Sequence, residues 1–180
     1  MNSVLEAPAG VTSGWRRLAR WRVPLGFLCA FVALWLAQPT MGSLAWGGAI
    51  AVLGEAIRVW AAGHLEKSRE VTSSGPYRFT RHPLYLGSTV MAVGIAVAAQ
   101  HLAVWVLVAA YVFVMIGSAI RSEEAFLRSR FGGDYDAYAA GHLKNEVRAF
   151  SVERALRNRE WRAVVGAGIG FALLAAKVML

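Results

Sequence analysis

The residues best suited to chemistry lie in one short stretch, 75–87, which reads Gly-Pro-Tyr-Arg-Phe-Thr-Arg-His-Pro-Leu-Tyr-Leu-Gly. In it a basic, aromatic loop passes directly into an apolar run. Pro83 suits the first position of a helix, because the N–H that proline lacks has no partner there in any case. This places His82 at the helix cap. A helix start presents unpaired N–H groups and a partial positive charge, which favour a carboxylate or phosphate. The stretch is therefore predicted to bind an anionic group.

Two further groups of charged residues adjoin apolar runs. Glu55 and Arg58 are three residues apart within residues 41–62, so they share one face of a helix. Charged side chains inside a membrane span are costly and usually face a bundle interior or a polar cavity. Two interpretations stay open for this pair: an ion pair that locks two helices together, or a contact with a substrate. Glu123 and Glu124 follow the longest charge-free stretch and form an acidic pair.

The composition is that of a membrane protein. Apolar residues make up 57% of the 180 residues, the mean hydropathy is +0.45, and the apolar residues come in long runs. Seventeen of the nineteen Lys and Arg residues lie in segments 16–22, 67–81 and 121–162, which alternate with apolar runs. This alternation is typical of cytoplasmic loops. The net charge of +8 is therefore assigned to loops at a bilayer, and nucleic acid is not expected as a partner. The single cysteine, Cys29, cannot form an intrachain disulfide.

The apolar runs predict four to five transmembrane helices. Residues 24–37 and 41–62 supply the first two helices. A basic segment followed by an apolar run also fits a signal peptide. The basic segment lies far from the N-terminus, however, and more apolar runs follow, which favours an uncleaved span. Residues 83–120 contain no charged residue, and as one helix these 38 residues extend about 57 Å against a hydrocarbon core of about 30 Å. This run must therefore fold into a hairpin, with its turn at the polar break 99–101. Residues 163–180 form a possible fifth span.

The remaining segments are polar. Residues 1–14 are predicted to be disordered, and Gly132-Gly133 to end a helix that leaves the membrane, with Asp134 capping the next helix. Residues 152–162 predict a basic amphipathic helix on the membrane surface. Lys177, inside the last apolar run, is expected to extend toward the far surface. The whole chain, 1–180, is predicted to be one all-α domain, a polytopic membrane helix bundle.

The hairpin returns the 75–87 loop and Glu123-Glu124 to the same membrane surface. Together they predict an interfacial pocket with cationic and anionic walls, which suits a zwitterionic cofactor and a lipid-borne substrate. Gly87 and Gly94, seven residues apart on one helix face, allow close packing against another helix. The sequence contains no Gly-rich phosphate loop and no Cys/His metal spacing, so no metal site is predicted.

The order and spacing of these motifs resemble the isoprenylcysteine carboxyl methyltransferase and phospholipid methyltransferase superfamily. The resemblance covers about residues 45–145 and is carried by Gly75-Pro76-Tyr77-Arg78, Arg81-His82-Pro83-Leu84-Tyr85-Leu86-Gly87, Glu123-Glu124, Phe131-Gly132 and Tyr135-x-x-Tyr138. It implies an integral membrane enzyme that uses S-adenosylmethionine. The cofactor-binding residues that it implies are Arg81, His82, Tyr85, Leu86, Glu123, Glu124 and Tyr135.

The same resemblance bears on location and substrate. Residues 54–61 are similar to the span that precedes the motif in bacterial members, which implies the bacterial inner membrane. The basic residues before the first span and in both later loops predict that the N-terminus and the cofactor site are cytoplasmic. The chain departs from eukaryotic members after residue 150, where a basic segment leads into an extra apolar run. This departure leaves the identity of the acceptor open.

The expected chemistry makes few demands on side chains. The sulfonium methyl is already an activated electrophile, so the enzyme need only align the attack and exclude water. Arg58 offers a carboxylate a bidentate partner, so a lipid-like carboxylate such as an isoprenylcysteine-type group is the predicted acceptor, with Arg58 and Glu55 as catalytic residues. An amine acceptor must first lose a proton, to Glu55 or to a glutamate of the second motif. Phospholipid amine N-methylation, a nicotinamide-dependent membrane reductase and a non-catalytic membrane protein remain alternatives.

Overall fold

The computed structural model describes residues 13–67, 69–142 and 148–179, with side chains from residue 24 onward. Within these residues the regular structure is helical throughout and contains no strand, so the all-α prediction is confirmed. The elements in chain order are α1 (Ser13–Leu36), α2 (Met41–Ala62), the 3-10 helix η1 (Gly75–Arg78), α3 (Pro83–Ala99), α4 (Leu102–Tyr111), the π-helical turn η2 (Val112–Ile116), α5 (Gly117–Phe131), α6 (Gly133–Ala139), α7 (Val152–Arg157) and α8 (Trp161–Met179).

Among the described residues, three helices are long and apolar enough to cross a membrane: α2, α8, and the continuous helical path of α4, η2 and α5 from Leu102 to Phe131. Two shorter apolar helices, Pro24–Leu36 and α3, stand among them. The 30-residue path of α4, η2 and α5 is about 45 Å long, well beyond the hydrocarbon thickness of about 30 Å. Its last turns therefore leave the apolar layer, and these turns carry the acidic pair.

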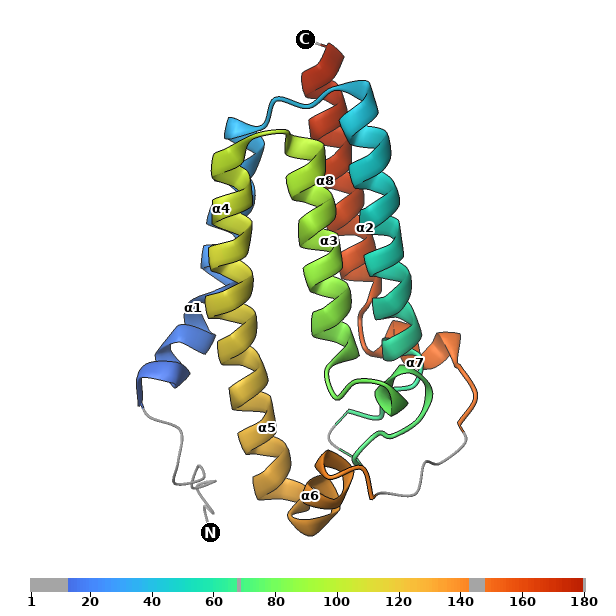
Figure 1. Cartoon of the computed structure of the whole chain (residues 1–180). Helices are drawn as coiled ribbons and strands as arrows, with labels where there is room; N and C mark the ends of the chain where they lie inside the picture. The colour runs from blue at the N-terminus through green and yellow to red at the C-terminus, as the bar shows by residue number, and fades with distance from the viewer. Residues whose placement is uncertain (1–12, 68, 143–147, 180) are drawn as a thin grey trace.

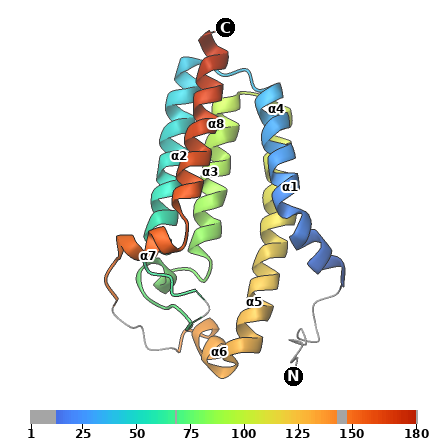
Figure 2. The same cartoon turned by 180° about the vertical axis from the view of Figure 1, so that it is seen from behind.

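The helices stand side by side in one bundle (Figures 1 and 2). α2, α3 and α8 group together, and α1 lies against α4 on the other side. The connections 37–40 and 99–101 and the C-terminus lie at one end of the bundle, while η1, α6 and α7 lie at the other. This second end, which we call the motif end, gathers the polar loop and the acidic pair.

The closest helix contact is between α2 and α3, and glycines make it possible. A Cβ added at Gly54 would lie 2.7 Å from the carbonyl oxygen of Gly87, and one added at Gly47 would lie 2.5 Å from that of Gly94. Any side chain there would strike backbone rather than a flexible side chain. The predicted packing face of Gly87 and Gly94 is thus confirmed, and it meets an equally spaced glycine pair on α2.

The hairpin turn lies where the polar break predicts it. α3 ends at Ala99, Gln100 takes the left-handed conformation with φ of 49°, and His101 caps α4 by accepting a hydrogen bond from the N–H of Ala103 at 3.2 Å. The turn is tied to the α1–α2 connection, because the N–H of Gln38 donates to the carbonyl of Ala99 at 2.8 Å. Below it, small side chains form a tight buried cluster: Ala33, Ala37, Ala96, Ala98, Ala99, Val104 and Leu174.

Some predicted boundaries are wrong. α1 already begins at Ser13, so the disorder predicted for 1–14 is wrong at its last two residues, and the rest of that segment lies outside the described residues. The helix predicted over 152–162 is broken: α7 ends at Arg157, and Arg159 adopts φ of 61° before α8 starts. A non-glycine residue in this conformation cannot continue a right-handed helix.

One predicted side-chain role changes: Asp134 lies inside the first turn of α6 and does not cap it, and Gly132 holds the cap position. Lys177 is exposed near the end of the bundle opposite the motif end, and its Nζ donates to the carbonyls of Leu34 at 2.9 Å and Trp35 at 2.7 Å. These carbonyls are at the end of α1, where a helix leaves them without partners and a cation is favoured.

Candidate functional site

The two motif segments meet at the motif end of the bundle. His82 Nε2 lies 3.1 Å from Glu124 Oε1, and Arg81 Nη1 lies 3.4 Å from the same oxygen. The hydroxyl of Tyr138 donates to the carbonyl of Tyr77 at 2.7 Å. These contacts join the loop before α3 to α5 and α6, as the hairpin geometry predicts.

A polar cavity of about 540 Å³ lies between these segments, and we call it the polar pocket. Four of the seven predicted cofactor residues line it, together with Arg58 from α2. The complete lining is Arg58, Leu65, Glu66, Lys67, Glu70, Val71, Thr72, Tyr77, Arg81, Leu84, Tyr85, Ala119, Ser122, Glu123, Phe126, Leu127, Tyr135 and Tyr138. The loop that follows α2 therefore forms a wall of this pocket that sequence reasoning missed.

Three predicted cofactor residues stand outside this lining. His82 occupies the predicted cap position, but its side chain makes no capping hydrogen bond and turns to Glu124. Glu124 also pairs with Arg128 at 3.6 Å, the helical neighbour four residues on. Leu86 is 48% exposed on the surface of α3. Glu124 and His82 thus support the wall that carries Arg81, while Glu123 faces the pocket itself.

The polar groups of this pocket fit a zwitterionic nucleoside such as S-adenosylmethionine. Ser122 Oγ is buried and, among the described residues, has no hydrogen-bond partner, while the hydroxyl of Tyr135 is buried beside the carboxylate of Glu124. Such groups are costly unless a ligand or water satisfies them. Arg81 offers a cation to a carboxylate, and Glu123 offers a carboxylate to an ammonium or to hydroxyls. The residues present therefore match the charges and hydrogen-bonding groups of that cofactor.

The tyrosines of the pocket are kept in their neutral form. Burial raises the pKa of Tyr138 to about 12 and the pKa of Tyr77 further still, with the carboxylate of Glu123 adding to the shift at Tyr77. Burial also raises the pKa of Tyr135. At neutral pH these phenols are hydrogen-bond donors.

Arg58 is the centre of a second polar cluster, between α2, α3 and the start of α8. Its Nη2 lies 2.6 Å from Glu160 Oε1, and its Nε lies 3.7 Å from Glu55 Oε2. Its Nη1 donates to Ser88 Oγ. Glu160 is 7% exposed, so this ion pair is largely withdrawn from water. Both open interpretations have support: Arg58 links helices, and it also faces two cavities.

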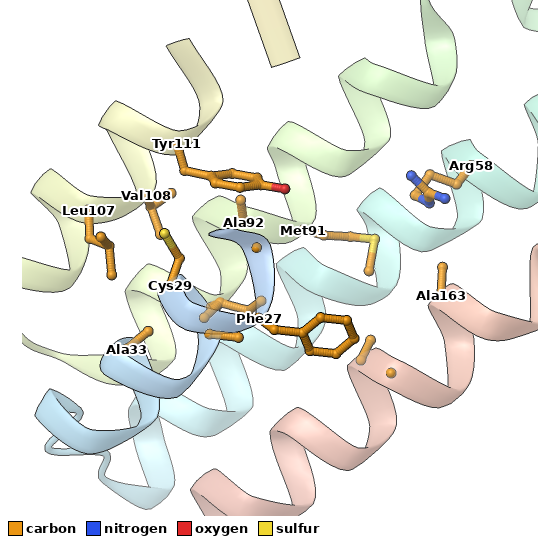
Figure 3. A pocket seen from close by; sticks show the side chains of 15 residues that line it. Phe27, Cys29, Ala33, Arg58, Met91, Ala92, Leu107, Val108, Tyr111 and Ala163 are labelled. Atoms are coloured by element: carbon orange, nitrogen blue, oxygen red, sulfur yellow. The ribbon is translucent and has the colours of Figure 1, made fainter. Parts of the chain in front are cut away.

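The second cavity is apolar and larger, about 730 Å³, and we call it the apolar groove (Figure 3). Of its fifteen lining residues only Arg58, Tyr111 and Cys29 carry polar groups apart from the thioether of Met91. The lining comes from α1 (Gly26, Phe27, Cys29, Ala30, Ala33), α2 (Arg58), α3 (Met91, Ala92, Ile95), α4 (Leu107, Val108, Tyr111) and α8 (Ala163, Gly166, Ala167). Arg58 therefore lies where the polar pocket and the apolar groove adjoin.

Glu160 is the partner of Arg58 that sequence reasoning missed. Its signal was present but weak: it is an acidic residue three positions before the apolar run 163–180, and Arg58 lies near the end of the apolar run 41–62. A charge near the inner end of one span needs an opposite charge on another span at the same depth. The predicted partner, Glu55, lies farther from Arg58 than Glu160 does.

The described residues contain no group of three or more His, Cys, Asp or Glu side chains placed to hold a metal ion. The membrane-length helices and the polar pocket at one end of the bundle are those of an integral membrane protein. A family model described as phospholipid methyltransferase matches residues 21–134, and the chain belongs to this family. The superfamily resemblance of the motifs is thereby confirmed.

Two curated relatives carry names that concern metal resistance. The cobalt-zinc-cadmium resistance protein CzcN of Cupriavidus metallidurans is 31% identical over 127 residues, which cover 64% of this chain and 56% of that protein. The nickel-cobalt-cadmium resistance protein NccN of Alcaligenes xylosoxydans xylosoxydans is 33% identical over 102 residues, covering 56% and 45%. The chain thus spans about half the length of the curated relatives it matches. No solved structure matches it.

Proposed function

We propose that this protein transfers the methyl group of S-adenosylmethionine to the polar head of a lipid-like acceptor held in the bilayer. The observation that carries the proposal is the position of Arg58, which lines both the polar pocket and the apolar groove. An acceptor whose head group lies at Arg58 has that head group beside the polar pocket. The hydrocarbon part of the same acceptor stays in the apolar groove. When bound, the cofactor supplies an activated methyl group.

The residues of the polar pocket are assigned to binding and orientation. Arg81 pairs with the cofactor carboxylate, and Glu123 accepts hydrogen bonds from its ammonium or ribose hydroxyls. Ser122, whose hydroxyl is otherwise unpaired among the described residues, supplies a further hydrogen bond, and Tyr135 lines the pocket beside it. His82 and Glu124 hold Arg81 in place. Tyr77 and Tyr138, neutral at physiological pH, close the pocket against water.

The charges around Arg58 favour an amine as the acceptor head. Two carboxylates, Glu55 and Glu160, face one guanidinium, so the cluster has excess negative charge where solvent is scarce. A protonated amine balances this charge, and Glu55, whose two oxygens are buried without a hydrogen bond among the described residues, is placed to take its proton before methyl transfer. This reaction is phospholipid amine N-methylation, and membership of the phospholipid methyltransferase family supports this choice of acceptor.

A carboxylate acceptor of the isoprenylcysteine type is the second candidate. The 2.6 Å contact of Arg58 with Glu160 supports it, because an incoming carboxylate that displaced Glu160 would meet the same guanidinium. The two products differ chemically: alkali releases methanol from a methyl ester, whereas an N-methyl group survives alkali. This difference decides between the two acceptors.

The first experiment measures ligand binding to the purified protein in detergent. Binding of S-adenosylmethionine but not of NADPH supports the methyltransferase. Binding of NADPH alone would favour the reductase alternative, and binding of neither would favour a non-catalytic membrane protein.

The second experiment incubates the protein with bacterial membrane lipids and methyl-labelled S-adenosylmethionine. Label that enters the lipid fraction and survives alkali supports the amine acceptor, and label released as methanol supports the carboxylate. For either acceptor, Arg58→Lys should depress methyl transfer and leave cofactor binding nearly unchanged, because lysine does not reproduce the planar guanidinium group of arginine with its several N–H donors. Label that enters only water-soluble compounds would contradict the lipid acceptor.

The proposed location is the bacterial inner membrane, with the motif end on the cytoplasmic side. The three membrane-length helices and the family support an integral membrane protein. The cytoplasmic orientation rests on the basic residues of segments 67–81 and 121–162, and on the need of a polar cofactor to enter from the cytoplasm.

A further inference from the structure

The C-terminal segment 148–179 lies beyond the part of the chain that matches the family model, yet it is bound tightly to the site. Glu66, which lines the polar pocket, pairs with Arg154 and Arg157, each at 3.0 Å. The side-chain nitrogen of Asn158 donates to the carbonyls of Ala62 and Leu65, each at 2.9 Å. These contacts satisfy carbonyls at the end of α2 and fix the segment that leads into α8.

The break between α7 and α8 brings Glu160 to Arg58. Arg159 leaves helical geometry with φ of 61°, and α8 starts anew at Trp161. Glu160 lies at this break, 7% exposed, with its carboxylate on the guanidinium of Arg58 at 2.6 Å. The start of α8 is therefore held at the point where the two cavities adjoin.

From this point α8 forms one wall of the apolar groove. It contributes Ala163, Gly166 and Ala167. The second and third follow the first by three and four residues, so all three lie on one helix face. A Cβ added at Gly166 would have no atom within 4 Å, so this face borders open space rather than another helix. Figure 3 shows Ala163 on α8 across from Met91 on α3, with the ring of Phe27 of α1 below Met91 in this view. Phe27 remains 73% exposed, so the groove is open toward the bilayer beside it.

We propose that segment 148–179 builds the acceptor side of the site: α8 walls a groove that takes one hydrocarbon chain of the acceptor, and Glu160 positions Arg58 at the end where the head group lies. The inference rests on the proposed function for the identity of the head group. The occupant is a hydrocarbon chain because the lining is apolar along α1, α3, α4 and α8 and becomes charged only at Arg58. Along α1 the lining runs from Gly26 to Ala33, about 10 Å of helix, which suits an extended chain rather than a compact ligand.

The small residues of the α8 face leave the room for this chain. Gly166 and Gly168 offer a matched comparison, since a Cβ at either meets nothing within 4 Å but only Gly166 lines the groove. Leucine at either position makes the same change in helix propensity. Only at Gly166 does the leucine side chain enter the space assigned to the acceptor.

The test uses photo-crosslinking in lipid nanodiscs that contain phosphatidylethanolamine with a diazirine in one acyl chain. In the wild type we expect crosslinks on the groove residues of α3, Met91 and Ile95, in addition to outward-facing residues such as Ile169, which is 58% exposed. Gly166→Leu should lower the α3 crosslinks about tenfold, while Gly168→Leu leaves them unchanged within about twofold. Unchanged S-adenosylmethionine binding in both variants reports that the bundle is folded.

The outcomes separate this inference from the proposed function. Equal loss of α3 crosslinks in both variants, or loss in neither, would overturn the assignment of the apolar groove to the acceptor chain, even if the wild type methylates lipids. The Gly166-specific loss in a protein that transfers no methyl group to any lipid would retain the groove and overturn the proposed function.

Glu160 is tested as a positioning residue by its effect on the acceptor. Glu160→Gln should raise the KM for the lipid acceptor about tenfold and leave the affinity for S-adenosylmethionine within about twofold. The reason is that Arg58 loses its nearest charge partner, whereas Arg81 and Glu123 in the polar pocket do not contact Glu160. Glu160→Asp should recover part of this loss. Glu153→Gln is the control, since Glu153 is 88% exposed and pairs only loosely with Arg157 at 3.9 Å. An unchanged KM in Glu160→Gln would refute the positioning role.

Discussion

Glu123 and Glu124 are neighbours in sequence, and the structure predicts that their loss has different consequences. Glu123 lines the polar pocket, so Glu123→Gln should remove a charge-assisted hydrogen bond to S-adenosylmethionine, worth about 1.5–3 kcal/mol. The dissociation constant should therefore rise roughly ten- to hundredfold. Thermal stability without cofactor should change little.

Glu124 instead binds three cationic or imidazole partners at 3.1–3.6 Å: His82, Arg81 and Arg128. The two arginines have side chains 46% and 49% exposed, so each pair contributes at most about 1 kcal/mol. The His82 contact is better shielded, with side chains 15% and 18% exposed. Glu124→Gln, which can still hydrogen-bond His82, should lower the free energy of unfolding by about 1–2 kcal/mol. It should change the cofactor dissociation constant by no more than about threefold, through a less constrained Arg81.

The assay measures cofactor binding by calorimetry and the unfolding midpoint in the same detergent for the wild type and both variants. Arg128→Ala is the comparison variant: it removes the most exposed partner of Glu124, together with the pair of Arg128 with Asp136 at 3.5 Å and its contact with the Tyr135 ring. Because Arg128 is half exposed, this change should affect neither quantity much. The opposite pattern, with Glu123→Gln binding like the wild type and Glu124→Gln folded but unable to bind, would refute the assignment of the polar pocket as the cofactor site.

Three further predictions concern the bundle, the tyrosines and the topology. Gly54→Ala should destabilise the protein by about 1–3 kcal/mol because the added Cβ meets the backbone of α3 at 2.6 Å, whereas Gly48→Ala, whose Cβ finds only a ring carbon at 3.8 Å, should be neutral or slightly stabilising in detergent unfolding. Burial raises the pKa of Tyr138 to about 12 in the folded protein, whereas a tyrosine of the unfolded chain titrates near pH 10. The free energy of unfolding should therefore fall as the pH rises from about 10 to about 12, and Tyr138→Phe should flatten that decline. Gln100, in the turn after α3, and Ser129, in the last turn of α5, are exposed and belong to opposite ends of the bundle. In intact cells a membrane-impermeant thiol reagent should therefore label Gln100→Cys and spare Ser129→Cys. Labelling of both would contradict the proposed orientation.

Much of the architecture can be predicted from the sequence because it depends on local, one-dimensional patterns. A charge-free run too long for one crossing must fold back, and its polar break at Gln100 marks the turn. Pro83 begins α3 because its geometry and missing N–H suit that position alone. Gly87 and Gly94 share a helix face by their spacing, so their use in close packing follows. These features need no knowledge of other segments.

The site itself required the tertiary structure, because it depends on helix rotation and on partners far apart in the chain. Spacing alone cannot say which of two adjacent glutamates faces a pocket; the packing of α5 against the loop before α3 turns Glu123 inward and Glu124 toward His82. Spacing also favoured Glu55 as the partner of Arg58, since the two share a helix face, but the break at Arg159 brings Glu160 closer. The sequence thus determined which residues could carry charge at the membrane surface. Their pairing was decided by how α8 packs against α2, because a buried charge is stabilised by whichever opposite charge the fold brings within reach.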